Sequence, residues 1–62
     1  MYTIFCDFEN LQPLITEAEA MYLDFKLVSE KPGLQVYFDN QYQEEELETR
    51  LAELGIYYEI ER

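Results

Sequence analysis

Acidic and amide side chains follow an apolar run near the start of the chain. The segment TIFCDFENLQ, residues 3–12, brings Asp7, Glu9 and Asn10 together after aromatic and β-branched residues that favour a strand. Divalent cations such as Mg²⁺ take oxygen ligands, and metal-assisted phosphodiester cleavage uses clustered carboxylates. These residue types could therefore serve a nuclease, or they could be the solvated end of an ordinary strand.

The letters DFEN, Asp7 to Asn10, resemble the opening motif of the NYN branch of PIN-like nucleases. The resemblance implies that Asp7 would bind a metal ion and that Asn10 would orient the site. Those nucleases need further acids on later strands of a parallel sheet, in a much longer chain. The element order predicted below supplies no such sheet. We therefore expect a solvated strand end with no metal and no cofactor, and the nuclease stays the remote alternative.

Other catalytic chemistry finds little support in the residue types. The chain has no histidine, so the usual base near neutral pH is missing, and Ser29 is its only serine. The two glycines, Gly33 and Gly55, are explained by a turn and by a helix end, so no phosphate-binding loop is present. Cys6 lies among apolar neighbours and favours a packed thiol. We expect a protein that is not an enzyme.

Length and charge narrow the remaining classes. The 62 residues predict a single domain, residues 1–62, and the 48% hydrophobic content indicates a folded chain. Fourteen acids against four bases give a net charge of −10, which repels phosphates and anionic lipids. We expect no direct contact with nucleic acid or membrane, and a protein with a basic surface as the natural partner. One cysteine allows no disulfide within the chain, which favours the cytoplasm.

Hydrophobic periodicity predicts the elements. Strands are expected over residues 2–8, 24–29, 34–39 and 56–61, with the turn EKPG between the second and third. A helix is expected from Asn40, its cap, to Gly55, its stop, with Gln43 reaching back to the cap and with an Arg50–Glu46 pair. Its apolar stripe is Leu47, Leu51 and Leu54.

Residues 16–23 are compatible with two structures. Thr16 and Glu19 could form a capping box for a short helix, whereas alternating residues from Leu23 onward suit a strand. The helix gives the order β-α-β-β-α-β, that of a ferredoxin-like fold, an antiparallel sheet with both helices on one face. The strand gives β-β-β-α-β. Both describe a small α+β domain.

The uncovered face of such a sheet needs an explanation. Alternation predicts one set of side chains toward the helices: Leu34, Val36, Phe38, Ile56, Tyr58 and Ile60. The opposite face would carry Phe5, Asp24, Lys26, Tyr37, Tyr57, Glu59 and Glu61. Aromatic residues on such a face can stack RNA bases, but the acids around them disfavour that role. Tyrosines among acids suit protein contact, so Tyr37 and Tyr57 are predicted anchors.

The dense carboxylates suggest imitation of a nucleic acid. The helix is expected to place Glu44, Glu45, Glu48 and Glu53 toward solvent, and Glu59 and Glu61 form an acidic pair on the last strand. In size and charge the chain resembles small phage and mobile-element proteins that block host defence enzymes. The hypothesis is an inhibitor that occupies a basic, nucleic-acid-binding surface, and the alternatives are a homodimeric adaptor or acidity that only keeps the chain soluble. The predicted partner-binding residues are Tyr37, Tyr57, Glu44, Glu45, Glu48, Glu59 and Glu61.

Overall fold

The computed structural model describes residues 2–62. In chain order the elements are β1 (Tyr2–Cys6), the short 3-10 helix η1 (Phe8–Asn10), α1 (Leu11–Ala20), β2 (Asp24–Leu27), β3 (Gly33–Tyr37), α2 (Gln41–Glu53) and β4 (Tyr58–Glu61). The predicted chain order β-α-β-β-α-β is confirmed. The alternative order β-β-β-α-β is wrong, because a helix separates the first two strands.

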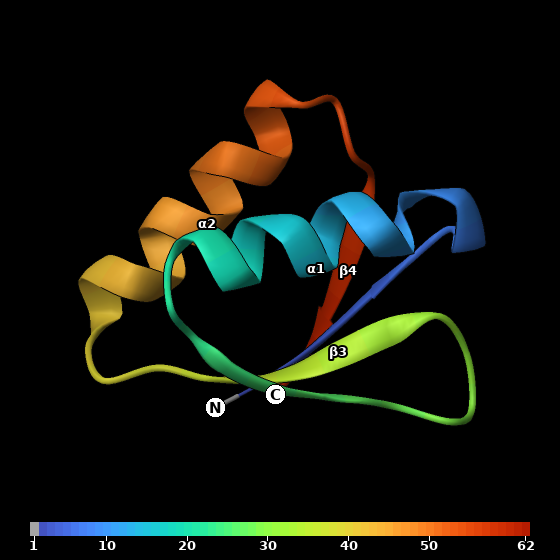
Figure 1. Ribbon diagram of the computed structural model, residues 1–62, viewed down its shortest axis with the longest axis horizontal. Coiled ribbons are helices and arrows are strands. Elements are labelled where there is room, and N and C mark those ends of the chain that lie inside the picture. The colour runs from blue at the N-terminus through green and yellow to red at the C-terminus, as the bar shows by residue number, and fades with distance from the viewer. Residues whose placement is uncertain (1) are drawn as a thin grey trace.

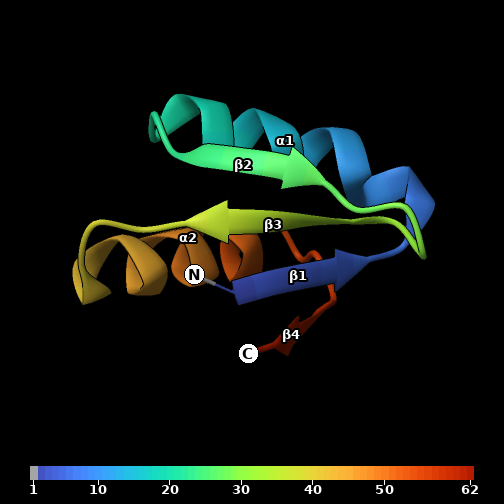
Figure 2. The same ribbon diagram turned by 90° about the horizontal axis from the view of Figure 1, so that it is seen from below.

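The four strands form one antiparallel sheet, with the lateral order β2-β3-β1-β4. β1 therefore lies in the middle of the sheet and pairs with β3 on one side and with β4 on the other. Figures 1 and 2 show both helices against the same face of the sheet, while the helices leave the other face uncovered. The predicted α+β class, an antiparallel sheet with two helices, is confirmed.

The hydrophobic core lies between the sheet and the helical layer formed by α1 and α2. Its buried members are Tyr2, Ile4, Leu14, Ala18, Leu23, Leu34, Val36, Leu47, Leu51 and Ile56. Alternate residues of β1 and β3 point to the helices, and Ile4 stands directly opposite Leu34 across the strand pair. Phe38, predicted to face inward, packs on this core with its ring 4.9 Å from that of Tyr2, edge to face.

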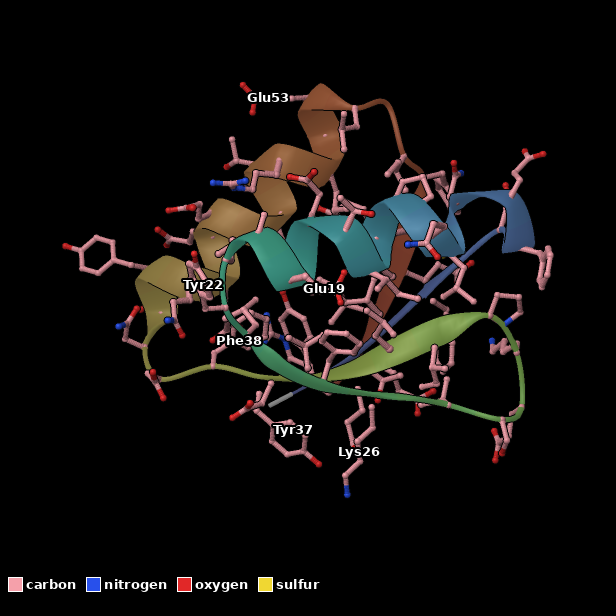
Figure 3. All side chains as sticks on the ribbon, in the orientation of Figure 1. Glu19, Tyr22, Lys26, Tyr37, Phe38 and Glu53 are labelled. Atoms are coloured by element: carbon pink, nitrogen blue, oxygen red, sulfur yellow. The ribbon has the colours of Figure 1, made fainter. Side chains whose placement is uncertain are left out.

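The remaining strand residues define the open sheet face: Thr3, Phe5, Asp24, Lys26, Gln35, Tyr37, Glu59 and Glu61. Figure 3 shows Lys26 and Tyr37 pointing to the side of the sheet away from the helices. The predicted division of the strands into two faces is therefore confirmed for these two residues.

The start of α2 follows the sequence closely. The Oδ1 atom of Asn40 accepts a hydrogen bond from the backbone N–H of Gln43 at 3.1 Å, which caps the helix. The Gln43 side chain reaches back and accepts from the backbone N–H of Asp39 at 2.6 Å. Leu47 and Leu51 are fully buried, as their spacing predicts.

The first helix begins earlier than the predicted range 16–23. Pro13 sits in its first turn, where a backbone N–H has no helical acceptor, so the helix tolerates it there. Thr16 lies inside the helix, and its hydroxyl donates to the backbone carbonyl of Gln12 at 2.9 Å. The predicted capping box of Thr16 with Glu19 is therefore wrong.

The end of α2 forms a closed turn around Gly55. The N–H of Gly55 donates to the carbonyl of Ala52, and the N–H of Ile56 donates to that of Leu51, both at 3.0 Å. This pair of bonds is a Schellman motif, and Gly55 has the positive φ of 72° that the motif requires. The motif brings Ile56 into the core beside Leu51, whereas Leu54, predicted to be part of the apolar stripe, is 54% exposed.

The end of α1 forms the same motif with a residue less suited to it. Tyr22 donates to the carbonyl of Glu19, and Leu23 donates to that of Ala18, both at 3.0 Å. Tyr22 thereby occupies the left-handed position with φ 57°, and its side chain is 94% exposed. A side chain in this conformation costs about 1 kcal/mol or more relative to glycine.

Exchanging residue types at the two equivalent turns should change stability in opposite directions. Tyr22→Gly is expected to stabilise the fold by about 1 kcal/mol, because it relieves the strain and loses no buried contact. Gly55→Ala is expected to destabilise it by about 1 kcal/mol through φ alone, since no atom lies within 4 Å of an added Cβ. Urea denaturation followed by circular dichroism measures both. Equal shifts of the same sign would contradict this account.

Candidate functional site

The seven residues predicted to bind a partner lie on three separate parts of the structure. The open sheet face carries Tyr37, Glu59 and Glu61, the loop between α2 and β4 carries Tyr57, and α2 carries Glu44, Glu45 and Glu48. They therefore do not form one continuous surface. The helical layer and the open sheet face must be considered separately.

The two predicted tyrosine anchors lie at opposite ends of the sheet. Tyr37 ends β3, is half-buried, and its hydroxyl donates to the side-chain oxygen of Gln35 at 3.0 Å. Tyr57 precedes β4, whose first residue Tyr58 pairs with Cys6 at the far end of β1. Tyr57 is 70% exposed but belongs to a loop, so its predicted place on the sheet is wrong. One flat partner surface would not engage both tyrosines on the sheet.

Two of the three predicted α2 glutamates are engaged within the chain. The Glu44 carboxylate pairs with the Arg62 guanidinium at 3.2 Å, and Glu48 accepts a hydrogen bond from the Tyr2 hydroxyl at 3.1 Å. The same guanidinium lies 5.0 Å from the centroid of the Tyr2 ring. The expectation that Glu44 and Glu48 lie on the solvent side is therefore wrong, whereas Glu45 is exposed as predicted.

The pKa shifts around Glu48 follow from this burial. Burial raises the pKa of Tyr2 above its usual range, and the charge and hydrogen bond of Glu48 raise it further. Burial raises the pKa of Tyr58 as well, with a second contribution from Glu48. Both phenols thus stay protonated above the pH at which a free tyrosine ionises. Glu48 serves the contact of α2 with β1 and β4, so it is not free for a partner.

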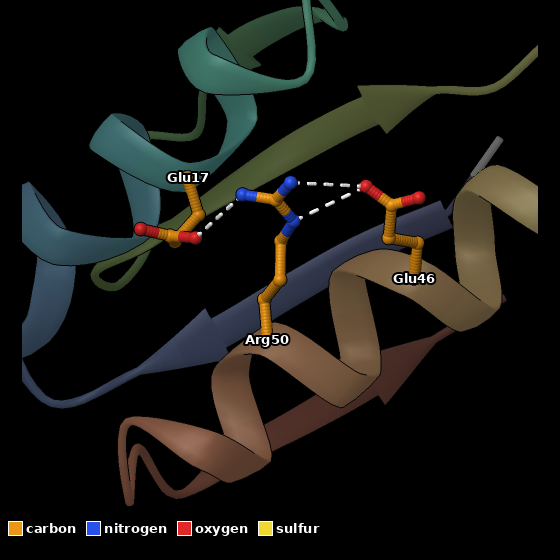
Figure 4. A network of polar contacts seen from close by, with 3 residues as sticks. All are labelled: Glu17, Glu46 and Arg50. Carbon is orange, nitrogen blue, oxygen red and sulfur yellow. Dashed lines mark hydrogen bonds and ion pairs between the residues drawn. The ribbon is translucent and has the colours of Figure 1, made fainter.

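Arg50 joins the two helices through carboxylates on both. Figure 4 shows its guanidinium between Glu17 of α1, at 3.2 Å, and Glu46 of α2, at 3.1 Å. The predicted pair of Glu46 with Arg50 is confirmed, and Glu17 is the partner that sequence reasoning missed, because only the packing of α1 on α2 brings it close. Hydrogen bonding to Glu17 is the main cause that raises the pKa of Arg50. The network is partly exposed, so it orients the helices more than it stabilises them.

The glutamates that remain exposed define the acidic helical face: Glu19, Glu45, Glu46 and Glu53. Together α1 and α2 contain seven glutamates and one basic residue, Arg50. A groove of about 500 Å³ runs beside Arg50 and is lined by Glu17, Glu46, Thr49, Glu53 and Leu54. The helical layer is therefore the most acidic part of the described chain.

Two exposed aromatics at the helix ends escaped the sequence analysis. Tyr42, in the first turn of α2, and Tyr22 are both almost fully exposed. Tyr42 lies on the side of α2 away from Leu47, a position that helical periodicity could have indicated. Tyr22 carried no such signal, because its predicted place was on the apolar stripe of the first helix.

The open sheet face is less acidic than predicted. It holds Asp24, Glu59 and Glu61, but also Lys26, and the Lys31 ammonium lies 4.5 Å from the centroid of the Phe5 ring. Cations and aromatic rings attract each other in this geometry. Half of the four basic residues of the chain are thus on or over this face.

The possible metal-binding segment ends β1. Asp7 is exposed and precedes η1, which contains Glu9 and Asn10. Among residues 2–62, no group of three or more histidine, cysteine, aspartate or glutamate side chains is arranged to hold a metal ion. Cys6 is partly buried beside this segment, and burial followed by the charge of Asp7 raises its pKa. The segment therefore gives the structure of a strand end leading into a helix.

Two searches for likeness complete the description. No helix within residues 2–62 combines the length and the apolar character needed to cross a membrane. In comparisons with known proteins, the chain matches no family model, no curated protein and no solved structure.

Proposed function

We propose that this chain is a non-enzymatic binding protein that inhibits a target by stoichiometric contact, with its acidic helical face against a basic, nucleic-acid-binding surface. The observation that carries the proposal is the imbalance of charge on α1 and α2, seven glutamates against one arginine. Such a surface complements the Lys- and Arg-rich surfaces that bind phosphates. An origin in a phage or mobile element and a place in the cytoplasm belong to the same proposal.

The shape of the helical layer supports this role. Arg50 already shows that a guanidinium fits between carboxylates of the two helices, with contacts of 3.1 and 3.2 Å. The groove beside it offers Glu53, exposed and without a printed ion pair, to a further basic side chain. Glu19 and Glu45 extend the same charge along α1 and α2. Close charge pairs of this kind raise the rate of association and make it depend on salt.

The test removes three exposed carboxylates that the fold does not use. The variant Glu19→Gln/Glu45→Gln/Glu53→Gln should lose a basic nucleic-acid-handling protein that the wild type captures from cell extract at low salt and releases at high salt. The captured protein is then purified, and its binding to nucleic acid is titrated with the acidic protein. Complete inhibition at a fixed stoichiometric ratio is expected.

A matched control separates the place of the charges from their number. The variant Asp7→Asn/Glu9→Gln/Glu30→Gln removes the same three charges from exposed loop positions and η1. It should capture and inhibit the target as the wild type does. If both triple variants lose the target equally, net charge alone explains the capture and the acidic helical face has no specific role.

We further propose that the arrangement is a ferredoxin-like fold. The proposal is supported by two split β-α-β units. α1 joins β1 and β2, with β3 between them in the sheet, and α2 joins β3 and β4, with β1 between them. A measured structure with a different strand order would contradict it.

A homodimeric adaptor is the second candidate function. The observation that favours it is the distribution of charge and aromatic side chains on the open sheet face, a surface separate from the acidic helical face.

A further inference from the structure

One row of side chains crosses the open sheet face from edge to edge. The pairing of the strands sets Lys26 beside Gln35, Gln35 beside Thr3, and Thr3 beside Glu61. The row therefore begins with a positive charge on β2 and ends with a negative charge on β4. Its two middle members are small or neutral.

The next row places an aromatic ring near the middle of the sheet. Phe5 of β1 stands opposite Gly33 of β3 on one side and Glu59 of β4 on the other. The Phe5 ring leans over Gly33, because a Cβ at position 33 would come within 2.8 Å of the Phe5 Cδ1 atom. The ring thus covers the boundary between the two central strands.

We propose that the open sheet face is the interface between two copies of this chain, related by a twofold axis that runs along the strands between β1 and β3. Such an axis sets β2 of one copy against β4 of the other. Lys26 of each copy then faces Glu61 of its partner, and Gln35 faces Thr3. Because each Phe5 ring leans toward the axis, the two rings meet across it.

A second copy fits this face by its charge pattern. An isologous interface must be complementary to itself, and the row from Lys26 to Glu61 has that property, since its ends carry opposite charges at equal distances from the axis. Sheets that pack face to face keep their strands within about 30° of each other, which preserves the match between rows. Lys31, whose ammonium lies over Phe5, is on a loop and must move aside.

The size of the domain makes such a partner useful. All ten buried core residues lie between the sheet and the helices or at the helix ends, so the half-buried Phe5 and Tyr37 gain no cover from the described chain. A domain of about 60 residues is marginal alone, and association adds a second hydrophobic layer. The inference is independent of the acidic helical face, which stays exposed on both outer sides of the dimer.

The test is a pair of charge reversals that are measured separately and then mixed. Sedimentation equilibrium of the wild type should show a reversible dimer of the 7.5 kDa chain. Lys26→Glu and Glu61→Lys should each weaken dimerisation about 10-fold or more, since each reversal sets two pairs of like charges face to face. An equimolar mixture of the two variants should dimerise with near wild-type affinity, because opposite charges face each other again.

The mixture is the decisive arm, since no contact within one chain can be restored by adding another. Glu45→Lys, which changes the net charge as Glu61→Lys does but lies on the acidic helical face, should dimerise as the wild type does. Circular dichroism checks that each variant is folded. A wild type that stays monomeric at the highest concentration, or a mixture that associates no better than its components, would overturn the inference.

Discussion

Gly33→Ala should leave most of the protein unfolded at room temperature. A Cβ at this position would overlap the carbonyl oxygen of Ile4 and would lie 2.8 Å from the Phe5 Cδ1 atom. The carbonyl belongs to the central strand, so relief requires β1 and β3 to separate where they pair. We expect a loss of about 3 kcal/mol or more, against a total stability of about 3–9 kcal/mol for 62 residues.

Thermal unfolding followed by circular dichroism measures this effect. A loss of about 3 kcal/mol corresponds to a drop in Tm of about 12–24 °C in a domain of this size. Gln35→Ala is the control, because it changes the same strand without adding a Cβ, and its Tm should fall by only a few degrees. A Gly33→Ala variant as stable as this control would show that the strands can separate at little cost.

The elements that the sequence predicted well are those set by local chemistry. Asn40 and Gln43 identified the start of α2, and Gly55 identified its end, because a cap and a left-handed turn each require particular residue types. Hydrophobic alternation likewise indicated which side chains of β3 face the core. These signals lie within a few residues of the positions they determine.

The first helix shows where local signals are insufficient. Pro13 suggested a break before residue 16, but a proline in a first turn breaks no hydrogen bond. Tyr22 then takes a left-handed conformation that a glycine would have announced in the sequence. Packing of Leu14 and Ala18 on the sheet compensates for both, and sequence periodicity does not reveal that compensation.

The candidate site was harder to predict for a related reason. Charge and residue type indicated a glutamate-rich α2, and Glu45 is exposed on it as expected. The partners of Glu44 and Glu48 are Arg62 and Tyr2, which lie far away in the sequence and come close only through the pairing of β4 with β1. A surface can therefore be recognised as acidic from sequence, while the carboxylates free to act on it follow from the tertiary structure.

Leu47→Ala should be the most damaging truncation on α2. Leu47 is fully buried between the helical layer and the sheet, so its loss leaves a cavity in a small core. We expect a cost of about 2–5 kcal/mol, which is comparable with the whole stability of the domain. The urea midpoint, measured by circular dichroism at one low protein concentration, should fall sharply or reach zero.

Leu54→Ala makes the same chemical change one position before the turn at Gly55. Leu54 is 54% exposed, because the Schellman motif brings Ile56 into the core in its place. Its truncation should cost no more than about 0.5 kcal/mol. If the two leucines proved equally important, the stripe of Leu47, Leu51 and Leu54 would continue into the core as the sequence predicted, and the turn at Gly55 would have to be drawn differently. A large cost at Leu47 alone would instead establish that the turn at Gly55 decides which apolar side chains of this segment stabilise the fold.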